Sequence, residues 1–144
     1  MRRVLPGGNR EAQRRLLTAA RYEVIPTASI EEKVIASVPI DVTMTVTASP
    51  VKGLEPTLDL AERFAKHGYQ VVPHVAARLL RDEQHLAEVV DRLKAAGIAE
   101  IFVPAGDADP PAGVWDASLP ALQALSRMGN PIPQVELTGY PESH

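Results

Sequence analysis

The sequence predicts an α/β fold in which parallel strands alternate with crossover helices. Strand-type and helix-type segments alternate from residue 21 onwards in units of about 30 residues, the spacing of βαβ units. Several strand segments also carry polar side chains on one face, as barrel strands do near their carboxyl ends. We therefore expect a partial (β/α)8 TIM barrel with about five parallel strands over residues 21–144, preceded by a helical extension over residues 1–20.

The extension is rich in arginine and contains one acidic residue, Glu11. Asn9 is suited to cap a helix, and Leu16 and Leu17 should then face inward. An arginine-rich, acid-poor segment is also typical of a transit peptide or of an arm that contacts nucleic acid. We favour the helix and expect no nucleic-acid partner.

The first strands and the helix between them have clear local signals. The segment "RYEVIP", residues 21–26, is a short strand bounded by proline, and "DVTMTVT", residues 41–47, alternates strictly. Between them, residues 29–38 have helical spacing, with Ser29 as N-cap and Glu32 completing a capping box. The remaining elements are helices over residues 53–68, 81–97 and within 113–130, where Pro120 favours a late start, and strands over residues 69–77, 99–106 and 134–140.

Two architectures are compatible with this alternation of strands and helices: an open doubly wound sheet and a barrel. Sheets covered on both faces tend to have continuously apolar strands, whereas Glu23, Thr45 and His74 place polar groups on one face. No strand is followed by a glycine-rich phosphate loop of the GxGxxG or GxxxxGK[ST] type. A complete barrel has eight strands and about 250 residues. We therefore expect another copy or a partner chain to complete the barrel, or the chain to be the N-terminal piece of a longer protein.

Glu23 is the most informative candidate for chemistry because it lies in the middle of the first strand. A carboxyl group that points into a barrel is desolvated, which raises its pKa towards the range that a general acid needs. The alternative is a solvent-facing glutamate or an ion-pair partner of Arg21.

Four further candidates lie at or just beyond the carboxyl ends of strands, where barrels gather their catalytic groups. His74 ends the third strand, Asp107 follows the fourth, and Tyr140 and His144 follow the fifth. Taken singly, each also fits a structural role: a core histidine, a turn aspartate and a frayed terminus.

Composition excludes several kinds of site. The sequence has no cysteine, so disulfides and thiolate sites are excluded, and a reducing cytoplasm fits. No apolar run approaches the roughly 20 residues of a membrane helix. His67 and His85 fall on predicted helices and should face solvent, and the histidines and acids form no metal signature.

Four segments, in this order and spacing, resemble the methylenetetrahydrofolate reductase family: "RYEVIP", "VVPHVAAR", "AGIAEIFVPAGDADPPAG" and "LTGYPESH". The likeness covers roughly residues 21–144, about the first half of a catalytic domain. Members of the family are flavin-containing (β/α) barrels that reduce 5,10-methylenetetrahydrofolate to 5-methyltetrahydrofolate. The resemblance implies an oxidoreductase of one-carbon (folate and methionine) metabolism, with a folate substrate, FAD as cofactor and NAD(P)H as donor.

The resemblance also implies residue roles. Glu23 corresponds to the general acid that protonates a ring nitrogen of the folate, so that the five-membered ring opens to an iminium and accepts a hydride from the reduced flavin. Asp107 resembles an aspartate that lies near both the pterin and the flavin ring. Cofactor contacts are implied for Thr47, His74, Asp107, Tyr140 and His144.

Two features depart from the family pattern. Residues 47–57, "TASPVKGLEPT", replace a glycine-rich stretch, and Ala105 replaces an arginine that would help to hold an anionic cofactor. The missing barrel strands and Ala105 favour an alternative, a non-catalytic truncated barrel that acts as a binding or regulatory subunit. An aldolase or phosphosugar barrel is set aside because no lysine lies on a predicted strand.

Overall fold

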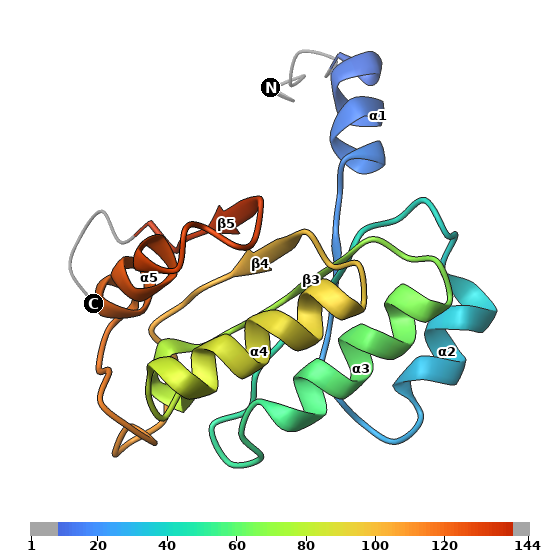
Figure 1. Cartoon of the computed structure of the whole chain (residues 1–144). Coiled ribbons are helices and arrows are strands. Elements are labelled where there is room, and N and C mark those ends of the chain that lie inside the picture. Colours follow the sequence, from blue (N-terminus) through green and yellow to red (C-terminus); the bar gives the residue numbers. More distant parts are fainter. Residues whose placement is uncertain (1–8, 140–144) are drawn as a thin grey trace, which may run out of the picture.

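The structure is a computed structural model that describes residues 9–139, and its helices and strands alternate in the predicted order (Figure 1). The α/β class with parallel strands is confirmed. The strands are β1 (Tyr22–Val24), β2 (Met44–Val46), β3 (Val71–Pro73), β4 (Glu100–Phe102) and β5 (Gln134–Glu136). The helices are α1 (Arg10–Thr18), α2 (Ile30–Ser37), α3 (Glu55–Lys66), α4 (Glu83–Ala95) and α5 (Ser118–Arg127), with a short 3-10 helix η1 (Ala77–Leu79).

The strands form two parallel sheets, ordered β1-β2-β3 and β4-β5. A single parallel bridge between His74 and Phe102 links β3 to β4, so all five strands lie side by side in sequence order. A doubly wound sheet would instead reverse its strand order partway. Among the described residues the strands do not close on one another, and the sheet stays open at β1 and β5.

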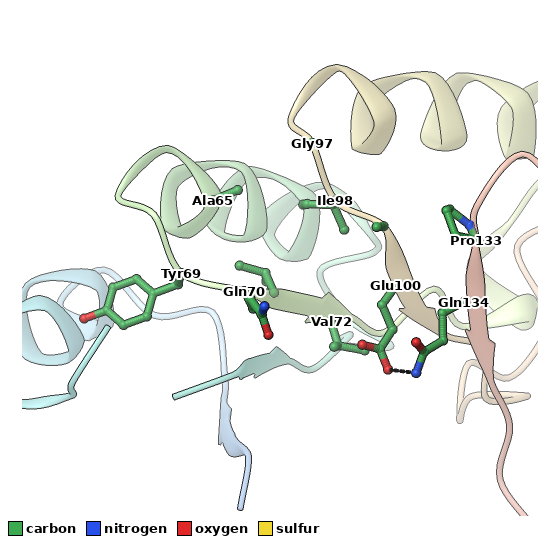
Figure 2. A pocket seen from close by; sticks show the side chains of 11 residues that line it. Ala65, Tyr69, Gln70, Val72, Gly97, Ile98, Glu100, Pro133 and Gln134 are labelled. Carbon is green, nitrogen blue, oxygen red and sulfur yellow. Dashed lines mark hydrogen bonds between the residues drawn. The ribbon is translucent and has the colours of Figure 1, made fainter. Parts of the chain in front are cut away.

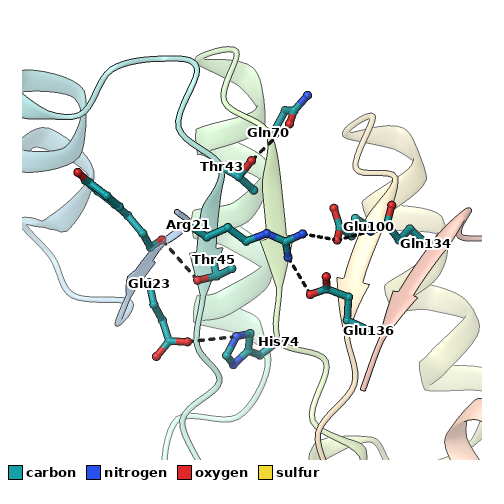
Figure 3. Close-up of polar contacts among 10 residues, drawn as sticks. Arg21, Glu23, Thr43, Thr45, Gln70, His74, Glu100, Gln134 and Glu136 are labelled. Atoms are coloured by element: carbon teal, nitrogen blue, oxygen red, sulfur yellow. Dashed lines mark hydrogen bonds and ion pairs between the residues drawn. The ribbon is translucent and has the colours of Figure 1, made fainter. Parts of the chain in front are cut away.

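The apolar core lies on one face of the sheet. Met44 and Val46 of β2 are fully buried in one cluster with Leu58 and Phe64 of α3. Because side chains alternate along a strand, Thr45 points to the other face, where Figure 3 shows a row of polar side chains. The alternation predicted for residues 41–47 therefore separates a helix-covered core from a polar face.

An arginine at the helix surface ties α3 to α4. Arg92 of α4 donates to Glu62 at 2.8 Å, to Glu55 at 2.6 Å and to Asp59 at 2.9 Å, all on α3. The hydrogen bond with Glu62 is the main reason why the pKa of Arg92 is raised, so this cation stays charged. The three carboxylates would otherwise repel one another on one helix face.

The N-terminal helix α1 stands apart from the body of the domain (Figure 1). Asn9 caps it as predicted, since its side-chain oxygen accepts from the backbone N–H groups of Glu11 and Ala12. The inward orientation predicted for Leu16 and Leu17 is wrong: they are 73% and 77% exposed. Helical spacing defines an apolar face, but among residues 9–139 no neighbouring element covers it.

The start of α2 also differs from the prediction. The helix begins at Ile30, but Ser29 makes no side-chain capping hydrogen bond. Its backbone lies at φ −105° and ψ 0°, away from the extended conformation that aims an N-cap side chain at the first turn. At α5, Pro120 lies in the first turn, where its missing N–H leaves no helix hydrogen bond unmade. Among residues 9–139, no helix is sufficiently long and apolar to cross a membrane.

The two helix histidines have different environments. His67 is exposed as predicted, and its Nε2 lies 3.2 Å from Glu31 Oε1. His85 is buried, which contradicts the prediction, and its Nδ1 accepts from the backbone N–H of Arg81 at 3.2 Å. A side chain in the first turn of a helix leans back towards the N-terminus, which brings this ring over the preceding loop. Burial, helped by the charge of Arg81, lowers the pKa of His85.

Candidate functional site

A cavity of about 280 Å³ lies at the carboxyl ends of the strands. Glu23 from β1, Thr47 after β2, His74 after β3 and Asp107 after β4 all line it. The carboxyl ends of parallel strands meet at one edge of the sheet, so residues far apart in sequence converge there. The two carboxylates proposed for chemistry, Glu23 and Asp107, thus share one cavity.

Glu23 is on the polar face of the sheet, and Figure 3 shows its carboxylate directed towards His74. Its side chain is 62% exposed, which agrees with the solvent-facing alternative and not with a carboxyl group buried inside a barrel. The physical reason is its place on β1, which among the described strands has a neighbour on one side only. Water therefore reaches the carboxylate from the open edge.

His74 is a largely enclosed side chain of the cavity, at 15% exposed. Its Nε2 lies 3.6 Å from Glu23 Oε2, longer than a direct hydrogen bond. Its ring packs edge-to-face against Phe102, with centroids 4.7 Å apart. Burial lowers the pKa of His74, and the charges of Glu23 and Glu136 offset this in part. The imidazole is therefore mainly neutral at pH 7.

Thr47 fixes the neighbouring strand ends. Its backbone N–H donates to the carbonyl of Val24 at 3.0 Å, and its hydroxyl group lies 3.3 Å from the same oxygen. Its own carbonyl accepts from the Thr57 hydroxyl at 2.8 Å, which joins the start of α3 to the end of β2. Thr47 therefore holds β1, β2 and α3 in place around the cavity.

The turn before Asp107 requires glycine. Gly106 has φ +88°, and a Cβ added there would lie 2.8 Å from the Cβ of Ala76. Both the backbone conformation and the close approach to the loop after β3 exclude larger residues. The "GD" pair in the sequence thus has a steric cause, and Asp107 itself is exposed at the rim of the cavity.

Arg78, which the sequence analysis missed, anchors the loop that carries Asp107. Its Nε donates to the carbonyl of Ala108 at 2.6 Å, and its own carbonyl accepts from the N–H of Ala112 at 2.8 Å. Arg78 and Ala105 line a neighbouring cavity of about 600 Å³ together with Asp107. The signal available in the sequence was a cation placed directly after the third strand, in "HVAAR".

Arg21 crosses the polar face and joins the first strand to the last two (Figure 3). Its guanidinium donates to Glu136 at 2.7 Å and to Glu100 at 2.8 Å. Gln134 donates to the same Glu100 oxygen at 2.7 Å. The alternative in which Arg21 pairs with Glu23 is therefore wrong. In the register of β4 and β5, Glu100 is paired with Gln134 and Glu136 with Phe102, so Glu136 lies two residues beyond the partner of Glu100.

A separate cavity of about 470 Å³ lies at the amino ends of β3, β4 and β5 (Figure 2). Gln70, Val72, Ile98 and Glu100 belong to its lining, and none of the predicted site residues does. Its position at the opposite end of the strands separates it from the Glu23 cavity.

Tyr140 and His144 lie outside the described residues. Within residues 9–139, no group of three or more histidine and acidic side chains is arranged to hold a metal ion. The sequence was also compared with models of known protein families, and none matches.

Proposed function

We propose that this chain carries part of a methylenetetrahydrofolate reductase-like active site, in a partial (β/α)8 barrel. One observation supports the proposal most directly. Glu23, Thr47 and His74 line a single cavity with Asp107, at the strand end where barrel enzymes hold their substrates. The proposed reaction reduces 5,10-methylenetetrahydrofolate to 5-methyltetrahydrofolate with NADH or NADPH, in the cytoplasm.

Glu23 acts as the general acid in this proposal. Its exposed carboxyl group can reach a ligand from the open side of the cavity and donate a proton to a folate ring nitrogen. The carbon–nitrogen bond of the five-membered ring then breaks, and hydride addition to the resulting iminium carbon gives the methyl group. Asp107, at the opposite rim, orients the pterin.

The polar groups of the cavity fit FAD, the cofactor that the resemblance implies. Thr47 offers a hydroxyl group, His74 an imidazole and Asp107 a carboxylate, which suit the mixed donors and acceptors at the edge of a flavin ring. When bound, a flavin supplies the hydride. Arg78 is a cation beside Ala105, the position where the family has arginine: its backbone N–H donates to the Ala105 carbonyl at 2.9 Å, and both residues line the neighbouring cavity.

Product formation tests the proposal. The purified chain is incubated with 5,10-methylenetetrahydrofolate and NADH or NADPH, with and without added FAD, and the folates are separated by mass spectrometry. We expect 5-methyltetrahydrofolate to form and the nicotinamide to be oxidised only when folate is present. Absence of product, together with no folate-dependent change in Trp115 fluorescence, would overturn the proposed function.

A second candidate function is that of a binding subunit that pairs through its open sheet edges. The observation behind it is that edge-strand apolar side chains are uncovered: Tyr22 is 49% exposed, Val135 36% and Leu137 55%. Unpaired parallel edges flanked by apolar groups favour association with another strand. We expect light scattering to show an oligomer, most simply of identical copies, that dissociates on Leu137→Lys. A wild-type monomer at all accessible concentrations contradicts this candidate.

A further inference from the structure

Glu23 and His74 are neighbouring titratable side chains that line one cavity, with 3.6 Å between Oε2 and Nε2. We infer that His74 is the proton-exchange partner of Glu23, rather than only a cofactor contact. The inference rests on the proposed function, because it assigns Glu23 the role of proton donor.

The positions of the two side chains allow a proton to pass between Nε2 of His74 and Oε2 of Glu23. Nε2 of His74 lies 3.6 Å from Oε2 of Glu23, a separation that a small movement or one bridging water converts into a hydrogen bond. Phe102 packs against the imidazole, and the His74 backbone is held by its N–H, which donates to the Val46 carbonyl at 2.9 Å. The ring is therefore fixed, and the more exposed Glu23 side chain is the partner free to approach it.

A ligand in the cavity changes which groups Glu23 can exchange protons with. The open side that now gives water access to Glu23 is the side from which a folate would enter. A bound folate would cover that side, whereas His74 lines the same cavity and stays within reach of Glu23. After Glu23 has donated its proton to the substrate, the neutral imidazole of His74 takes a proton from water and passes one from Nε2 to the Glu23 carboxylate. This transfer restores the protonated Glu23 and the neutral His74.

Charged groups on the neighbouring elements influence the pKa of His74. The carboxylate of Glu23 on β1 acts most strongly on His74, followed by that of Glu136 on β5. The charge of Glu136 is offset by Arg21 at 2.7 Å. The loop after β4 contributes Asp107 to the same cavity, whereas β2 and β4 contribute the uncharged Thr47 and Phe102. Burial lowers the pKa of His74, so a proton that the neutral ring takes from water is readily passed on.

The pair is tested first without catalysis, by proton NMR titration of the histidine rings. Glu23→Gln removes the negative charge that favours the imidazolium, so we expect the pKa of His74 to fall further. Glu31→Gln is the matched control, because it removes a carboxylate 3.2 Å from another histidine, His67. That control should leave the His74 titration unchanged. A His74 titration unaffected by Glu23→Gln would overturn the inference.

The second test uses turnover. We expect His74→Ala to lower kcat on the order of tenfold to a hundredfold, to change the pH–rate profile, and to be partly restored by added imidazole. A purely structural histidine would give neither the altered profile nor the rescue. If the wild type is active but both effects are absent, the inference fails and the proposed function stands. If the wild type makes no product, the proposed function fails and the NMR titration alone decides the pairing.

Discussion

Glu23→Gln should lower kcat for folate reduction by about 10²- to 10⁴-fold, the usual contribution of a general acid. Glutamine keeps the size and shape of glutamate but has no carboxyl proton to donate. The side chain is 62% exposed and makes no direct hydrogen bond with His74, so the free energy of unfolding should change by no more than about 0.5 kcal/mol. Steady-state kinetics and a thermal melt on the same preparation separate the two effects.

The matched control for this substitution is Glu32→Gln, on the exposed surface of α2. It makes the same chemical change far from the cavity and should leave kcat at the wild-type value. An unchanged kcat in Glu23→Gln would remove the proton-donor role of Glu23. Equal losses in both variants would point to a general effect of charge, which the proposed mechanism does not predict.

Gly113→Ala should destabilise the domain and displace the loop that carries Asp107. A Cβ at position 113 would lie 2.0 Å from the carbonyl oxygen of Arg81 and 2.3 Å from its Cα, so backbone must move. The adjacent hydrogen bond from Val114 N–H to the same oxygen, at 3.1 Å, would be lost with that movement. We expect a loss of roughly 1–3 kcal/mol in the free energy of unfolding, the range for overpacked sites.

Trp115 reports the movement directly, because it is the only tryptophan of the chain, lies in the same loop and is buried. Urea unfolding gives the stability change, and a red-shifted native-state emission indicates that the indole has become exposed. Gly139→Ala is the control, since an added Cβ there meets no atom within 4 Å. A Gly113→Ala variant with wild-type stability and emission would contradict the close packing of Gly113 against the backbone of Arg81.

Local sequence patterns predicted the elements well because they act over a few residues. Strict alternation over residues 41–47 correctly separated the buried Met44 and Val46 from Thr45 on the polar face. Asn9 was correctly assigned as a cap, since capping depends only on the next three residues. Ser29 failed as a cap because its own backbone conformation, set by the preceding turn, does not favour it.

Burial was predicted less well, since periodicity identifies a face but not the element that covers it. Leu16 and Leu17 form an apolar pair that no described element covers, and Glu23 is open to water at the sheet edge. His85 was expected on a solvent-facing surface but folds back over the preceding loop. In each case the missing information was the position of a neighbouring segment.

By itself, the sequence determined the alternation of strands and helices, the parallel α/β class and the strand ends that carry polar residues. These follow from side-chain periodicity, glycine and proline, whose effects are local. Only the tertiary structure decided that Glu23, Thr47, His74 and Asp107 line one cavity, and that Arg21 spans the sheet to Glu100 and Glu136. Such contacts join segments far apart along the chain, and they depend on strand register and sheet curvature, which no local pattern encodes.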